Sequence, residues 1–188
     1  MPNKGLLLVI SDPPAAFEEE FNAWYDTDHI PERLAIPGFE TGTRFVSADR
    51  ARRYLALYDL AHVGVLETPE YLAFSGTNFT PWSKRVVARC RIDRVVAVQA
   101  FPGNAPIGPG SRLLLVRVTG AASAVEAFSS RCFTGHPNVS QVRGFSEETA
   151  ERMHLLVGGH GDLARLIDSA AAAESAIRID AVETYLPY

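Results

Sequence analysis

The sequence has few cysteines, no excess of positive charge and no long apolar run. Its two cysteines, Cys90 and Cys132, lack a CxxC spacing, which favours buried free thiols in a reducing compartment and leaves a disulfide between them open. Eighteen Lys and Arg side chains against 22 Asp and Glu give a net charge of −4. Such a chain has no diffuse positive field, so we expect no nucleic-acid partner.

Other absences limit the chemistry. The apolar run at 6–10 has only five residues, too few for a signal-peptide core or a membrane span, so we expect a cytoplasmic protein with no membrane partner. The histidines form neither an HxxxH pair nor a Cys-His cluster, and we expect no metal site. GGHGD at 158–162 is neither a Walker loop nor GxGxxG, and there is no GxSxG elbow. We therefore expect no cofactor.

A Pro/Gly-rich segment at 102–110 divides the chain, and the strand-like segments before it recur in order after it. Four pairs of segments correspond: 6–10 with 113–117, 37–45 with 137–145, 53–58 with 152–157, and 91–102 with 178–188. The number of residues that separates a segment from its second copy decreases along the chain. The helix and loop segments of the second copy are therefore shorter, while its strands are kept. The sequence therefore predicts an internal repeat.

Each half reads β-α-β-β-α-β, the ferredoxin-like unit, which makes the fold class α+β. We expect a first repeat at 1–101, a linker at 102–110 and a second, shortened repeat at 111–188. Strands such as LLLVI and RVVAVQAF are apolar on both faces, which indicates burial of both faces of each sheet. The two antiparallel sheets are therefore predicted to pack together into an intramolecular α/β-barrel with the helices outside.

The most distinctive segment is FNAWYDTDHIPERLAIPGF at 21–39. Its pattern F-x-x-W-Y-x-x-x-H-I-P-E-R followed by P-G-F resembles the EthD-like branch of the dimeric α/β-barrel superfamily. The resemblance covers the first half of the chain and implies a ferredoxin-like fold with a cavity between each sheet and its own helices. Some relatives are cofactor-free cyclases, isomerases, decarboxylases or dehydratases acting on polyketide, aromatic or lactone substrates, and others are monooxygenases.

The same segment suggests a proton-transfer site. A helix is predicted at 17–28, and Pro31 should break it near His29 and restart it through 32–35. The break would turn His29 toward the cavity as the proton carrier, with Asp28 fixing its tautomer and Tyr25 beside it at i, i−4. The alternatives are that Asp28 caps the restarted turn and that His29 is a satisfied residue at a helix junction.

Six further residues are candidates for contacting a substrate, and five of them have a structural alternative. Trp24 would be a pocket wall or core, Arg44 a pocket or an exposed strand residue, and Tyr54 and Tyr58 cavity lining or barrel packing. Trp82 would close the pocket mouth or pack under a long connection. The sixth candidate is Arg33, from the motif itself.

Together these features favour a cofactor-independent acid–base enzyme of isomerase, lyase or cyclase type acting on a small aromatic, polyketide-like or lactone substrate. The alternatives are a non-catalytic or structural barrel that binds a small hydrophobe, and a cofactor-free monooxygenase. The enzyme hypothesis predicts a cavity of about 300 Å³ or more beside His29. Edge strands leave a homodimer open.

Overall fold

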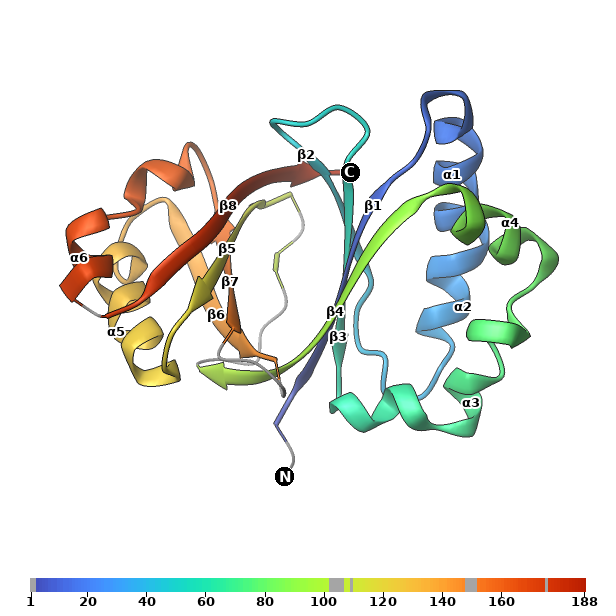
Figure 1. The fold of residues 1–188 in the computed structure, drawn as a ribbon, viewed down its shortest axis with the longest axis horizontal. Helices are drawn as coiled ribbons and strands as arrows, with labels where there is room; N and C mark the ends of the chain where they lie inside the picture. The colour runs from blue at the N-terminus through green and yellow to red at the C-terminus, as the bar shows by residue number, and fades with distance from the viewer. Residues whose placement is uncertain (1–2, 102–106, 109, 148–151, 175) are drawn as a thin grey trace. The chain divides into compact units, whose positions relative to one another are not determined.

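The computed structural model describes residues 3–101, 107–108, 110–147, 152–174 and 176–188 (Figure 1). The chain divides into two compact units, one of Met1–Arg44 with Arg50–Val96 and one of Phe45–Asp49 with Ala97–Tyr188. The predicted linker at 102–110 falls largely outside the described residues.

The first unit is built on two central strands and a layer of short helices. Its elements are β1 (Gly5–Asp12), η1 (Ala15–Phe17), α1 (Glu18–Trp24), η2 (Tyr25–His29), α2 (Ile30–Leu34), the start of β2 (Thr43–Ser47), β3 (Tyr54–Leu60), η3 (Val63–Glu67), α3 (Pro69–Leu72), η4 (Gly76–Asn78), α4 (Pro81–Arg89) and most of β4 (Arg91–Phe101). Helices α1, α2 and α4 lie on the same side of β1 and β3 (Figure 1).

Strands β1 and β3 pair antiparallel, from Gly5 opposite Leu60 to Ser11 opposite Tyr54. All seven residues of β3 are buried, as the apolar sequence YLALYDL predicts for a strand covered on both faces. Because side chains alternate along a strand, Leu7 and its partner Tyr58 belong to one face of the sheet. This register places the Tyr58 ring on the same face as Leu7 and Val9, where the cavity described below is found.

The PGF part of the motif forms a tight turn before β2. Gly38 has a φ of 95°, and a Cβ at this position would lie 2.4 Å from Cγ2 of Val65. Its carbonyl accepts a hydrogen bond from the N–H of Ala61 at 2.8 Å. Only glycine fits this conformation without strain, so the turn explains Gly38 structurally. The turn carries Phe39 into the core, where its ring lies 5.7 Å from that of Tyr58.

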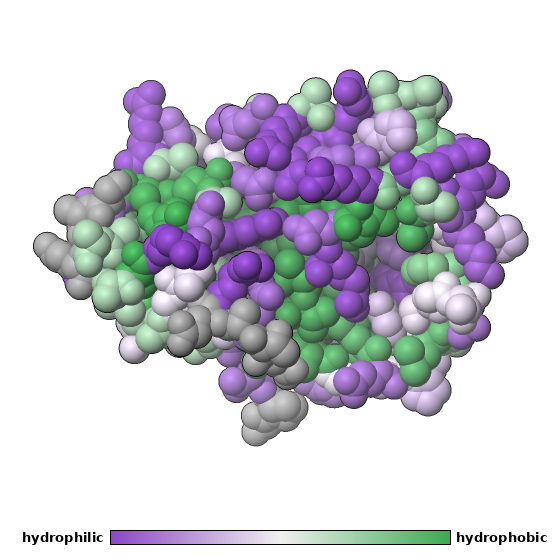
Figure 2. All heavy atoms as spheres, viewed as in Figure 1, coloured by the Kyte–Doolittle hydropathy of each residue, from purple (hydrophilic) through white to green (hydrophobic). Residues whose placement is uncertain are grey.

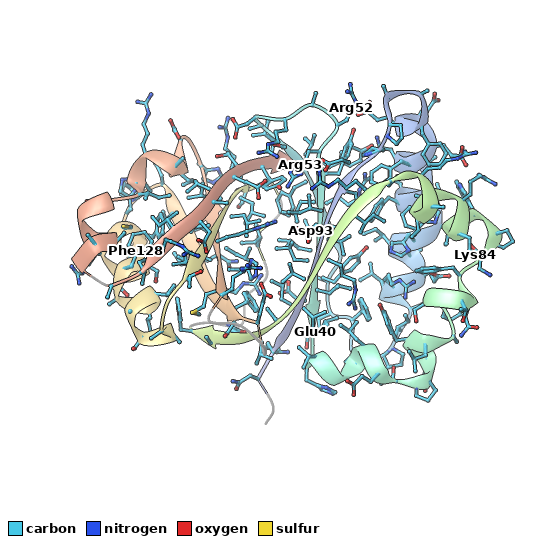
Figure 3. All side chains as sticks on the ribbon, viewed as in Figure 1. Glu40, Arg52, Arg53, Lys84, Asp93 and Phe128 are labelled. Atoms are coloured by element: carbon cyan, nitrogen blue, oxygen red, sulfur yellow. The ribbon has the colours of Figure 1, made fainter. Side chains whose placement is uncertain are left out.

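The second unit also combines antiparallel strands with short helices. It contains β5 (Arg112–Thr119), α5 (Ala122–Phe133), β6 (Val139–Ser146), β7 (Arg152–Gly159), η5 (Leu163–Leu166), α6 (Ser169–Glu174) and β8 (Arg178–Pro187). The hydrogen-bonded order is β2-β8-β5-β7-β6-β4, all antiparallel, with residues 45–47 of β2 and 98–101 of β4 taking part. Phe128 lies between α5 and these strands (Figure 3) and belongs to their shared apolar core.

Two expectations about the whole chain can be compared with the structure. Within the described ranges, no helix combines the length and apolar character needed to cross a membrane. Cys132 is buried, Cys90 is half-buried, and both are free thiols, so the disulfide alternative does not apply.

Candidate functional site

The helix that carries the motif does not break at His29, so this prediction is wrong. Helix α1 continues through a π-helical turn at Tyr25–His29 into α2, and the N–H of Ile30 donates to the carbonyl of Tyr25. Pro31 has no N–H and its ring crowds the carbonyl four residues earlier. A wider π turn accommodates that ring without ending the helix, and such turns are frequent at functional sites.

A cavity of about 190 Å³ lies in the first unit, between its strands and its helical layer. Its walls are mainly apolar and aromatic, with Trp24, Tyr25 and Tyr58 among them, and its polar lining includes His29 and two arginines. Figure 2 shows a hollow on this face of the first unit, between β4 and α2. The cavity is smaller than the 300 Å³ or so that we expected, because bulky aromatic side chains fill the space under the helices.

His29 is held between aromatic rings at the wall of this cavity. The indole of Trp24 stacks on the imidazole with 4.2 Å between centroids and 25° between planes. The ring of Tyr25 meets it edge-on at 5.3 Å. Nδ1 is sealed from solvent without a hydrogen-bond partner, yet the side chain is 13 % exposed, so the exposed part of the ring lies away from Nδ1. The imidazole therefore presents Nε2 as its accessible nitrogen.

Burial decides the protonation state of His29. Removal of the ring from water, helped by the positive charge of Arg33 nearby, lowers its pKa from 6.5 to about 3. Neighbouring carboxylates would favour the charged imidazolium, whereas burial favours the neutral ring. Burial dominates, so His29 is neutral at physiological pH and its accessible nitrogen can accept a proton.

The carboxylate nearest to the imidazole belongs to Glu32, not Asp28. Oε2 of Glu32 lies 4.0 Å from Nδ1, too far for a hydrogen bond but close enough to favour a proton on that nitrogen. In the described part of the chain Asp28 makes no hydrogen bond or ion pair with His29, and its Oδ2 is buried without a partner. The expected pairing of Asp28 with His29 is therefore not formed. The continuous helix places the i+3 residue, rather than the preceding one, beside the imidazole.

Trp24 is fixed in place by the start of α4. Its Nε1 donates to Oγ of Ser83 at 3.1 Å, and Ser83 is fully buried. The hydroxyl of Thr80, the N-cap of α4, donates to the same Oγ at 3.0 Å. Sequence reasoning missed Ser83 because it lies 59 residues from Trp24 and only the tertiary fold brings them together.

Arg33 is 2 % exposed, unusual for an arginine, and it lines the cavity. Its Nη2 donates to the carbonyl of Phe74 and lies 3.3 Å from Oε2 of Glu32. Its guanidinium lies 5.1 Å from the ring centroid of Tyr71, a cation–π contact. Its Nη1 is buried and has no hydrogen-bond partner. The cavity wall thus contains a buried positive charge with unused donor capacity.

Tyr25 and Tyr58 are both buried and line the cavity. Burial raises the pKa of Tyr25 to about 12 and that of Tyr58 well above its ordinary value. Both phenols therefore stay protonated at neutral pH and can donate a hydrogen bond.

The hydroxyl of Tyr58 is buried without a hydrogen-bond partner, and the side chain is 0 % exposed. We expect Tyr58→Phe to raise the free energy of unfolding by about 1 kcal/mol, because it removes an unsatisfied polar group without changing the shape of the ring. Urea denaturation of the two proteins measures the difference. A loss of stability instead would mean that the hydroxyl has a partner in solution.

Three other predicted residues lie outside the cavity. Arg44 forms an ion pair with Asp26, with its guanidinium 4.7 Å from the ring centroid of Tyr25. The hydroxyl of Tyr54 donates to Glu18 at 2.5 Å. Trp82 is half-buried and does not line the cavity. Among the described residues, no group of three or more His, Cys, Asp or Glu side chains could hold a metal ion.

No family model matches this sequence, and no curated protein matches it. Solved structures are similar over nearly the whole chain. An anthrone oxidase-like protein superposes with a TM-score of 0.66 at 10 % identity, covering 100 % of this chain and 92 % of the other. A proposed monooxygenase from Lactobacillus acidophilus NCFM gives 0.65 at 8 %, covering 98 % and 93 %. A proposed chlorite dismutase gives 0.59 at 7 %, covering 99 % and 95 %.

The fold is that of the dimeric α/β barrels. At these identities the likeness shows an α+β fold of antiparallel strands and helices, and no branch or reaction. The resemblance of the sequence motif implies a cavity between each sheet and its own helices, and the first unit has such a cavity. The sequence motif lies on the helical side of that cavity, with His29 and Arg33 in its wall.

Proposed function

We propose that this protein is a cofactor-independent acid–base enzyme, of isomerase, lyase or cyclase type, that acts on a small ring compound with His29 as the proton carrier. The observation that carries the proposal is a neutral imidazole whose accessible nitrogen lies at an apolar cavity. A neutral histidine in reach of a bound molecule is the usual general base of enzymes.

The surroundings suggest how the proton moves. Glu32 favours a proton on Nδ1, which leaves the lone pair of Nε2 available to take a proton from carbon or oxygen of the substrate. Apolar walls make the resulting imidazolium costly, so His29 would return the proton to the same substrate within one turnover. That behaviour favours a proton shift or an elimination within one molecule. The phenol of Tyr58 would donate to the oxygen that gains charge.

The proposal is tested by hydrogen exchange in D₂O. We expect the wild-type protein to catalyse deuterium incorporation next to the carbonyl of a small ring ketone or lactone from a panel, as followed by NMR. His29→Gln should reduce the exchange rate at least about 100-fold, because a positioned base contributes that much or more. His160→Gln, an exposed histidine of the second unit, is the matched control and should exchange as the wild type does.

The alternatives give different results in the same experiment. A non-catalytic barrel would bind panel compounds without exchange. The cofactor-free monooxygenase is favoured by the similar structures that are proposed monooxygenases or anthrone oxidase-like, and it would consume oxygen in a His29-dependent manner. Exchange that persists in His29→Gln would refute the role given to His29.

We also propose that the chain is a tandem repeat of ferredoxin-like units and belongs to the EthD-like branch. The repeat is supported by the order of elements, since β1-α1-β2-β3-α4-β4 is followed by β5-α5-β6-β7-α6-β8. The branch is supported by the motif at 21–33 and by the turn at Gly38. In this proposal the first unit keeps the site, and the second has no counterpart of the W-Y-x-x-x-H pattern.

A further inference from the structure

The charge of the cavity wall differs from that of the protein as a whole. The chain carries a net charge of −4, yet the charged residues that line the cavity are Arg33 and Arg94. Among the described residues no carboxylate lines it, and His29 adds no charge because it is neutral. A concave site with two positive groups in an acidic protein attracts small anions.

Arg33 is the group best placed to bind an anion. It is almost fully buried and held from several sides, so its position costs little entropy when a ligand arrives. Glu32 offsets part of its charge through Nη2, but Nη1 has no partner. A buried donor without a partner is costly, and a ligand oxygen would satisfy it. Arg94 is exposed, lines the same cavity and donates from Nη2 to the hydroxyl of Tyr71 at 3.4 Å.

The volume sets the size of the ligand. An apolar cavity of about 150 Å³ holds benzene in another protein, so about 190 Å³ holds one six-membered ring with a small substituent. The remaining wall is suited to a flat ring, since the rings of Trp24, Tyr71 and Phe79 and apolar side chains such as Val9 and Val87 contribute to it. Fused three-ring systems exceed this space.

We infer that the cavity takes a single aromatic or alicyclic ring bearing one negatively charged oxygen group, a carboxylate or phenolate, and that Arg33 pairs with that group. The inference rests on the proposed function, because it assigns the substrate class of the same site. It also gives the neighbouring His29 a defined target. Pairing of the charged group with Arg33 would hold the ring under the accessible Nε2.

Benzoate and benzamide test this inference, since they share size and shape and differ in charge. Titration calorimetry with the wild-type protein should show benzoate binding at least about tenfold tighter than benzamide, as a charge-assisted hydrogen bond adds that much. Amide chemical shifts should change at His29 and Arg33 when benzoate is added. Arg33→Gln should abolish the preference, and Arg94→Gln should weaken benzoate severalfold.

Two controls keep the test decisive. Arg91→Gln removes an exposed arginine of β4 outside the cavity and should leave both affinities unchanged. Arg33→Lys retains the charge and should keep most of the preference, which distinguishes loss of charge from loss of fold if Arg33→Gln unfolds.

The outcomes separate the two proposals. Equal affinity for benzoate and benzamide would overturn the anion inference while leaving His29 as a base. Selective benzoate binding without deuterium exchange on any panel compound would keep the anion inference and refute the proposed reaction. Binding of neither compound, or shift changes confined to residues outside the cavity, would overturn the anion inference, and the deuterium exchange experiment would decide the role of His29 separately.

Discussion

Replacing Arg33 by methionine is expected to lower the free energy of unfolding by about 3 kcal/mol. Methionine fills much of the same space, so the loss would come from charge and hydrogen bonding. The carbonyl of Phe74 would lose its donor, and the half-buried carboxylate of Glu32 would lose its cation. The cation–π contact with Tyr71 would also disappear. Urea denaturation at pH 7.5 measures the change.

The matched control for this change is Arg91→Met, because Arg91 is exposed on β4. Its effect on stability should stay within about 0.5 kcal/mol. If Arg33→Met cost no more than Arg91→Met, then Arg33 would not be held in the buried network described above. Its use as an anchor for an anion would lose its structural basis as well.

Replacing His29 by glutamine is expected to make the protein less sensitive to acid. The folded-state pKa of His29 is about 3, below the ordinary value of 6.5 that the unfolded chain has. Between these values the unfolded chain binds a proton that the folded protein does not, so stability falls as the pH drops below 6.5. From pH 7.5 to pH 5 the wild-type protein should lose about 2 kcal/mol through this residue. His29→Gln lacks that contribution.

Urea denaturation of both proteins at several pH values isolates the effect of His29. His154 in the second unit also has a pKa lowered by burial, and it contributes equally to both proteins. The difference in unfolding free energy between wild type and variant should therefore shrink by about 2 kcal/mol from pH 7.5 to pH 5. Parallel curves would show that the imidazole is not desolvated.

The sequence predicted the location of the candidate site better than its geometry. The motif at 21–33 indicated a helix with His29 directed at a cavity, and the structure has both. The error over Asp28 followed from the expected helix break at Pro31, because a broken helix changes which neighbour lies beside the imidazole. The π turn was not predicted, because a proline inside a helical pattern more often ends the helix than is accommodated within it.

Other features of the site depend on contacts that are distant in sequence. Arg33 was one of several substrate-contact candidates, and nothing in the sequence indicated that residues 71–79 would bury it. The hydrogen bond from Trp24 to Ser83 and the small volume of the cavity likewise result from tertiary packing. Arg44 and Tyr54 were plausible by strand position, but the fold uses them in contacts with Asp26 and Glu18.

The most direct test of this account is the protonation of His29 itself. Histidine labelled with ¹⁵N at both ring positions, with His29→Gln used to assign the signals, reports the charge of each imidazole across pH 5 to 8. The account predicts that His29 stays neutral throughout this range, with its proton on Nδ1 and an unprotonated Nε2. An ordinary titration with a midpoint near 6.5 would contradict it, since the imidazole would then lie in water rather than in the cavity wall.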